Sequence, residues 1–159
     1  MTNHWIIRVG DGKNFTNSRY PFWGMKRGKD DRIKGMIKNN FEEGDILWFI
    51  TSSPYGGKAI GLAEYTTYYD KKDETLVQIN TYSNKEQNWD GEEDWDLQIH
   101  YKNLYLSEKA DISIVLSCGS VINNYDTFKE RLEEKHENFI CLREHYRCFK
   151  KYGTVKQFN

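Results

Sequence analysis

The sequence is poor in cysteine and in metal-ligand patterns. Its 159 residues include three cysteines, Cys118, Cys141 and Cys148. An odd and sparse set of this kind does not form a disulfide framework, so reduced thiols are expected. Together with His145, the pair Cys141 and Cys148 could offer three metal ligands, but a closed zinc site needs four. We therefore expect no metal and no cofactor.

Long apolar runs are also missing. No run approaches the roughly 20 residues of a membrane span, and the N-terminus lacks the apolar stretch of a signal peptide. We see no internal repeat and no low-complexity tract. These absences predict an intracellular protein, cytoplasmic or nuclear, without a membrane partner.

Aromatic and charged side chains are plentiful. Hydrophobic residues make up 38% of the chain, aromatic residues 15% and charged residues 30%. This composition is typical of a folded protein rather than a disordered one, and 159 residues suit one domain with a substantial core. We expect a single domain over residues 1–159, in which some aromatic side chains serve binding rather than packing.

The formal net charge of -1 is unevenly distributed along the chain. Residues 1–38 carry nine Lys and Arg against three acids, residues 139–159 carry five against one, and residues 39–138 carry nine against twenty. If both basic ends fold onto one face, that face could attract phosphate. The alternative is a solvated mixture of charges, because segregation along a sequence need not become segregation in space.

Most of the predicted elements are strands. Compact or alternating apolar runs predict strands at residues 4–9, 44–50, 60–64, 75–82, 97–102 and 112–116. The loop 51–58 predicts a hairpin between two of them, and residues 83–85 predict a turn. Gly61 interrupts its strand, as glycine does where a backbone or ligand approaches closely. Trp5 and Trp48 lie inside predicted strands and are expected in the core.

Helices are fewer. Ile33, Met36 and Ile37 recur at helical spacing among charged residues, so residues 30–39 are predicted to form a short amphipathic helix. A second helix is predicted over residues 126–137. Five or six mostly antiparallel strands with helices at the rim predict an α+β fold, a small curled β-barrel.

The opening pieces follow one another in an informative order. The strand 4–9 is followed by Phe22-Trp23-Gly24, the basic helix, a strand opening with Gly44-Asp45, and the strand 60–64. In order and spacing they resemble the EVE and YTH branches of the PUA-like superfamily, over roughly residues 4–104. This resemblance implies a PUA-like barrel that reads a modified base: methylated adenine in RNA for the YTH branch, and modified bases in DNA for EVE-like domains.

Three tryptophans are candidate walls of an aromatic pocket. Trp23, followed by Gly24, lies where the resemblance implies the first cage residue, and Trp89 and Trp95 lie where the YTH-like pattern implies the remaining walls. A methylated base offers a flat π-face and an apolar methyl group, and aromatic walls satisfy both. The alternatives are core packing for Trp23 and a cover over the barrel end for the other two, of which we expect one to line the pocket.

Polar residues near these pieces could recognise the edge of the base or its phosphate. Asp11 and Asn14 are candidate edge readers, because Asn donates and accepts hydrogen bonds and Asp accepts them; turn formation is their alternative role. Ser52 and Ser53 could line the mouth of the pocket or simply serve the hairpin loop. The candidate phosphate contacts, which any solvated surface could also carry, are Arg8, Arg19, Lys26 and Arg27.

The sequence therefore predicts a non-enzymatic module that binds DNA or RNA and recognises a modified, methylated base in single-stranded or flipped nucleic acid. One alternative is a nucleic-acid-processing enzyme or accessory of PUA-like fold. Asp45 and Glu64 do not support it, because they fall on different predicted elements. The other alternative is a protein- or small-molecule-binding barrel that uses the same pocket.

Overall fold

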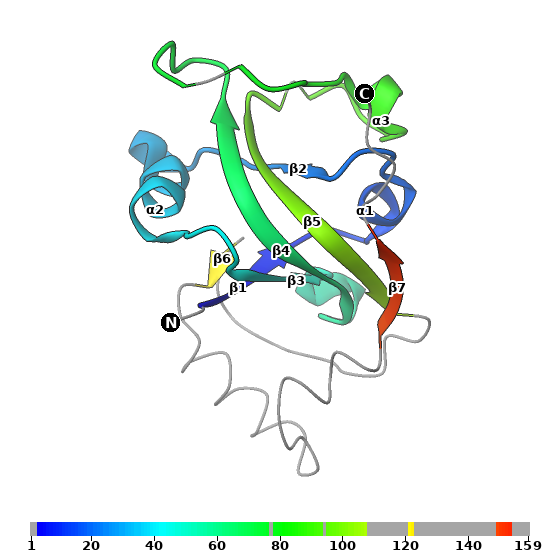
Figure 1. The fold of residues 1–159 in the computed structure, drawn as a ribbon. Helices are drawn as coiled ribbons and strands as arrows, with labels where there is room; N and C mark the ends of the chain where they lie inside the picture. The colour runs from blue at the N-terminus through cyan, green and yellow to red at the C-terminus, as the bar shows by residue number, and fades with distance from the viewer. Residues whose placement is uncertain (1–2, 77, 94, 108–120, 123–148, 154–159) are drawn as a thin grey trace.

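A computed structural model describes residues 3–76, 78–93, 95–107, 121–122 and 149–153. Its strands are β1 (His4–Arg8), β2 (Phe22–Gly24), β3 (Ile46–Ile50), β4 (Ala59–Asp70), β5 (Leu97–Ser107), β6 (Val121–Ile122) and β7 (Phe149–Gly153). Its helices are α1 (Lys13–Asn17), η1 (Lys29–Asp31), α2 (Arg32–Asn40), η2 (Ser53–Tyr55) and α3 (Asn84–Gln87), where η marks a 3-10 turn. Long β4 and β5 dominate the molecule, with α2 on one side and α1 and α3 on the other (Figure 1).

All of these strands belong to one mixed sheet. The hydrogen-bonded order is β2-β5-β4-β3-β1-β6, and β7 also pairs with β5. β1 and β3 are parallel, while the other pairs are antiparallel. A parallel pair needs a long crossover connection, which here contains α2. The α+β class and the largely antiparallel pairing are thus confirmed.

Over the ranges that the structure describes, the sheet does not close into the small curled barrel that the sequence predicts. Among the described residues, the path of hydrogen-bonded strands ends at β2 on one side and at β6 on the other. Alternation of apolar residues shows that a strand has a buried face, but it does not show whether the first and last strands pair. In the part of the chain that the structure describes, the fold is therefore an open mixed sheet whose two ends do not bond to each other.

The core lies between this sheet and helices α1 and α2. Every residue of β3 is buried, as expected for an unbroken apolar run that is covered on both faces. Trp5 and Trp48 are 2% and 0% exposed, which confirms their predicted core positions. Asp45 is buried with them and accepts hydrogen bonds from Trp5 Nε1 at 2.9 Å and from the backbone N–H of Glu42 at 3.0 Å. Asp45 thus has a structural role.

Helix α1 explains the interruption at Gly61. A Cβ atom at this position would lie 2.6 Å from the Phe15 ring, closer than real side chains pack. The Phe15 ring in turn stacks on Phe49, with ring centroids 4.3 Å apart. The close approach predicted at Gly61 is therefore made by an aromatic side chain of the core.

Several predicted elements differ from the structure. The described residues of 75–82 contain no strand, so that prediction is wrong there. Alternating apolar residues show which side chains could share a face, but not whether the segment pairs with a neighbouring strand. Residues 83–85 begin helix α3, whose N-terminus is closed by a capping box between Ser83 and Glu86. The strand predicted at 112–116 and the helix predicted at 126–137 lie outside the described residues.

Candidate functional site

A cavity of about 370 Å³ lies at the edge of β2, beside the end of β1. We call it the indole pocket, after Trp23, Trp89 and Trp95, which all line it. β1 and β2 are separated by three other strands in the sheet, so the sheet curls enough to bring these strands to one cavity without closing. The other predicted residues on its lining are Gly24, Asp11, Asn14, Ser52, Arg8 and Lys26.

Trp23 belongs to β2, although the sequence predicts no strand there. A segment of three residues is too short to show an alternating pattern, and Trp23 is paired with Ile99 of β5. Its ring is half-buried and meets the Phe15 ring edge-on, with ring centroids 6.1 Å apart. Trp23 therefore joins the core on one side and lines the indole pocket on the other.

Trp89 is fixed in place at the same edge. Its ring centroid lies 5.0 Å from that of Trp23 at an interplanar angle of 64°. Trp89 Nε1 donates a hydrogen bond to Ser18 Oγ at 2.7 Å, and this hydroxyl donates to the carbonyl of Asn14 at 2.8 Å. Trp89 and Trp95 both line the pocket, where one of the two was expected.

Trp95 packs directly on Gly24. A Cβ atom at Gly24 would lie 2.6 Å from Trp95 Cβ and would also overlap the indole ring. The backbone carbonyl of Trp95 accepts a hydrogen bond from Gln98 Nε2 at 2.9 Å. Glycine is thus required at position 24 by the close approach of this wall.

Gln87 positions the pocket without lining it, and the sequence analysis missed it. It is 0% exposed, and its Oε1 accepts hydrogen bonds from the backbone N–H groups of Arg19 and Tyr20 at 3.1 and 2.7 Å. Its Nε2 donates to the carbonyls of Tyr20 and Phe22 at 2.8 and 3.2 Å. The amide therefore binds the segment leading into β2 to the loop that carries Trp89. The one local signal was the Ser83–Glu86 capping-box spacing, which marks the helix but not the role of Gln87.

Asn14 and Asp11 take part in backbone turns. Asn14 Nδ2 donates to the carbonyl of Asp90 at 3.2 Å, while Asn14 Oδ1 accepts from the backbone N–H of Asp90 at 2.9 Å. Asp11 Oδ1 accepts from the backbone N–H of Lys13 at 2.9 Å. Asn14 thus holds the Trp89 loop with both ends of its amide, and exposed Asp11 is better placed to meet a ligand.

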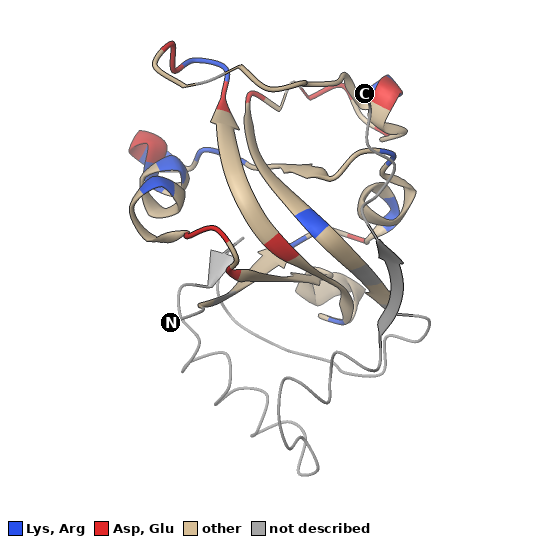
Figure 2. Ribbon diagram, viewed as in Figure 1, with Lys and Arg blue, Asp and Glu red and all other residues tan. Residues whose placement is uncertain are grey.

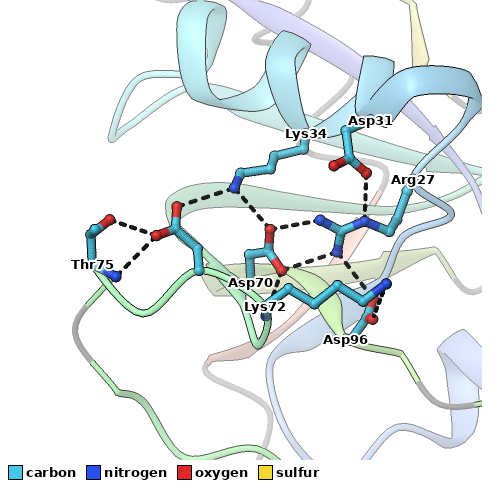
Figure 3. Close-up of polar contacts among 8 residues, drawn as sticks. Arg27, Asp31, Lys34, Asp70, Lys72, Thr75 and Asp96 are labelled. Atoms are coloured by element: carbon cyan, nitrogen blue, oxygen red, sulfur yellow. Dashed lines mark hydrogen bonds and ion pairs between the residues drawn. The ribbon is translucent and has the colours of Figure 1, made fainter.

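Three predicted site residues do not line the pocket: Arg19, Arg27 and Ser53. Arg19 is exposed and contributes its backbone N–H to Gln87, and Ser53 is exposed in η2. Arg27 is held by three carboxylates instead. Its guanidinium bonds to Asp31 at 2.6 Å, to Asp70 at 2.8 and 3.0 Å, and to Asp96 at 3.2 Å (Figure 3).

The electrostatic character of the pocket is mixed. Its lining carries the cations Arg8 and Lys26 and the carboxylates Asp11 and Glu93. Arg8 donates to the carbonyl of Thr51 at 2.8 Å, so its head group is oriented by the loop that also supplies Ser52. Elsewhere, acidic and basic residues are interspersed on η1, α2 and the loop after β4 (Figure 2). In the described N-terminal part, the alternative of a solvated charge mixture therefore fits better than a single basic face.

His100 of β5 is paired with Phe22 of β2, next to the strand segment that lines the pocket. Its environment leads us to expect that the stability of the fold depends on pH. Burial lowers the pKa of His100 to about 4, whereas an unfolded histidine titrates near pH 6.5. The unfolded chain then binds the extra proton first, so stability should fall as the pH drops from about 6.5 to 4. At about 1.4 kcal/mol per pKa unit, the loss is on the order of 2–3 kcal/mol.

Denaturant unfolding at pH 7 and pH 4.5 measures this loss. The His100→Gln variant, which keeps a polar side chain at the position, should lose markedly less stability than the wild type over the same interval. An identical loss in both proteins would assign the pH dependence to other groups.

The described ranges contain no group of three or more His, Cys, Asp or Glu side chains that could hold a metal ion, and no helix long and apolar enough to cross a membrane. Cys118, Cys141, His145 and Cys148 lie outside those ranges.

Comparison with known proteins adds little to this geometry. No protein-family model matches the chain, and no curated protein matches it significantly. The structure is similar to one described as a hypothetical protein from Leishmania major, with a TM-score of 0.44 and 15% sequence identity. The match covers 84% of this chain and 96% of that chain. A similarity at this level carries no argument about family or function.

Proposed function

We propose that the chain is a non-enzymatic module that binds DNA or RNA and recognises a modified base in the indole pocket. The observation that carries the proposal is the convergence of Trp23, Trp89 and Trp95 on one cavity. Its volume of about 370 Å³ falls within the range of roughly 300–1,000 Å³ that small-molecule sites occupy. Flat aromatic walls suit the face of a base and its methyl group.

Polar groups at the rim would supply selectivity. Asp11 and Ser52 offer hydrogen-bonding groups toward the edge of a base, and Lys26 and Arg8 offer positive charge toward a phosphate. A site that pairs the polar atoms of its ligand rejects a ligand lacking them far better than an apolar wall does. The resemblance of residues 4–104 to EVE and YTH domains supports the same proposal.

A second candidate ligand is a methylated ammonium group on a protein. Aromatic cages bind quaternary ammonium through cation–π attraction, and Asp11 and Glu93 on the pocket lining would add to that attraction. Arg8 and Lys26 line the same cavity and repel a cation. With two cations and two carboxylates on the lining, charge favours neither ligand, and the binding experiment has to separate them.

The experiment is a binding panel with short DNA and RNA oligomers that carry unmodified or methylated adenine and cytosine. We expect selective binding to one methylated base, and at least a tenfold loss of affinity in Trp23→Leu, which keeps an apolar side chain against Phe15. Tyr55→Ala is the matched control, because Tyr55 is 57% exposed and lies outside the pocket lining.

The proposal fails if no oligomer binds at low salt, or if the wild type and Trp23→Leu bind every oligomer equally. A trimethyl-lysine peptide, added to the same panel, tests the second candidate directly.

A further inference from the structure

Two further cavities continue from the indole pocket. The second cavity, of about 220 Å³, shares Trp95 with the indole pocket and is also lined by Tyr69, Lys71 and Gln98. The third cavity, of about 180 Å³, shares Tyr82 with the second and is lined by Tyr20, Phe22 and His100. The three cavities therefore follow one another, with one aromatic residue common to each neighbouring pair.

The pairing of strands explains this order. Gly24 of β2 is paired with Gln98 of β5, and Gln98 is paired with Tyr69 of β4. Paired residues on neighbouring strands share a face, and such strands lie about 4.8 Å apart. Gly24 in the pocket and Tyr69 in the second cavity are thus roughly 10 Å apart across the sheet. Phe22 pairs with His100 two residues further along the same face and contributes to the third cavity.

The aromatic residues between the cavities are held in place. The Tyr82 ring stacks on Tyr20, with centroids 3.8 Å apart and planes 10° from parallel. Phe22 stacks on His100 with centroids 5.4 Å apart. Trp95 is fixed by Gly24 and by the bond from Gln98. Rings that are already ordered lose little entropy when a ligand binds.

The second cavity also offers polar groups. Tyr69 is 9% exposed and lines this cavity. Lys71 is exposed on the same lining. A lysine ammonium and a phenolic hydroxyl are suitable partners for a phosphate or a base edge.

We propose that the second and third cavities bind the two successive nucleotides on one side of the modified one. The ligand is then a single strand that passes from the indole pocket over Trp95 and over Tyr82. Proteins that bind single strands place bases on aromatic side chains in this way. In a duplex with a flipped base, the next two nucleotides stay paired and stacked on each other and could not enter separate cavities. This inference rests on the proposed function and names its substrate class.

A length series tests the inference. The ligands are the methylated nucleoside preferred by the protein and single strands of two and three nucleotides, with the modified base at the first or the last position. Because the cavities lie on one side of the indole pocket, affinity should rise at least tenfold from nucleoside to trinucleotide in one polarity only. A duplex with the same modified base should bind more weakly than the single strand.

Two variants assign the gain to the cavities. Tyr82→Leu removes an aromatic surface that is worth about 5- to 160-fold per stacked base, and should weaken trinucleotide binding while leaving nucleoside binding unchanged. Lys71→Gln should weaken trinucleotide binding about threefold or more and flatten its salt dependence. Lys38→Gln is the matched charge control, because exposed Lys38 lines none of the three cavities.

The outcomes separate this inference from the proposed function. Selective binding of the nucleoside with equal affinity for all lengths, or equal gains in both polarities, would overturn the inference and leave the proposed function standing. Length-dependent binding without preference for a modified base would overturn the recognition of a modified base and would leave standing only the binding of a single strand across the three cavities. Failure of every nucleoside and oligomer to bind would overturn both.

Discussion

Replacing Arg27 with methionine is expected to lower the free energy of unfolding by about 3–5 kcal/mol, the usual cost of leaving a buried charge without its partner. The Asp70 side chain is 0% exposed and faces Arg27 Nη2 at 2.8 Å. Lys34 Nζ also approaches Asp70, at 3.0 Å, but one ammonium cannot replace a guanidinium that binds both carboxylate oxygens. The long aliphatic part of Arg27 is approximated by methionine, so the variant mainly removes the charge.

The pH profile provides a second readout of the same contact. Hydrogen bonds from Arg27, and then from Lys34, hold the pKa of Asp70 well below its usual range. An acid with a lowered pKa stabilises the fold above the unfolded pKa near 4, and this stabilisation is lost as the pH falls further. The acid-induced loss of stability below pH 4 should therefore be smaller in Arg27→Met than in the wild type.

Denaturant unfolding of Arg27→Met and of Arg32→Met makes the comparison. Arg32 begins helix α2 and is exposed, and the structure gives it no ion pair with any described residue. Its variant should stay within about 0.5 kcal/mol of the wild type. Equal stability of the two variants would contradict the structural role that we assign to Arg27.

Gly24→Ala, which adds a single methyl group, is expected to cause a large loss of affinity for the preferred oligomer. The added methyl group would overlap Trp95 at its Cβ and at its ring, and these atoms cannot move aside without moving the backbone. Trp95, which lines both the indole pocket and the second cavity, would therefore be displaced from its position between them. Since stacking on an aromatic ring is worth about 1–3 kcal/mol per base, we expect affinity for the preferred oligomer to fall at least about fivefold.

The matched control is Gly35→Ala in α2. A Cβ atom at Gly35 meets nothing within 4 Å, and alanine is the better helix former by about 1 kcal/mol. This variant should bind normally and should be as stable as the wild type or slightly more so. A folded Gly24→Ala protein with unchanged affinity would show that Trp95 is not a wall of the binding site.

The elements with clear patterns were predictable from the sequence. Three predicted strands and one predicted helix agree with the structure to within a few residues: 4–9 with β1, 44–50 with β3, 97–102 with the first part of β5, and 30–39 with α2. Strand β5 extends further than predicted. In each of them, the apolar run or helical spacing marks the side chains that face the core. The segment 75–82 has an alternating pattern too, but a strand also needs a neighbour with a free edge, and the pattern does not contain that information.

The aromatic residues of the candidate site were predictable from the sequence, but the residues that hold the surrounding segments in place were not. Trp23, Trp89 and Trp95 were singled out by their place in the order of pieces, and the fold brings them to one cavity. Arg27 looked like a surface cation because its partner Asp70 is 43 residues away in the chain. Gln87 acts through hydrogen bonds to a segment 65–68 residues away, which no local spacing predicts.

The binding of a modified base in the indole pocket can be measured most directly through the tryptophan side chains themselves. In ¹⁵N-labelled protein each indole N–H gives its own NMR signal, which can be assigned by single substitutions. Trp5, whose Nε1 donates to Asp45, and Trp48 lie in the core and serve as internal references. The ligands are single-stranded oligomers with methylated adenine or methylated cytosine, each titrated beside its unmodified counterpart.

We expect one methylated oligomer to shift the signals of Trp23 and Trp95 at concentrations where its unmodified counterpart does not, with the signals of Trp5 and Trp48 unchanged. If no oligomer moves the Trp23 and Trp95 signals, or if modified and unmodified oligomers move them equally, the protein does not recognise a modified base in this pocket.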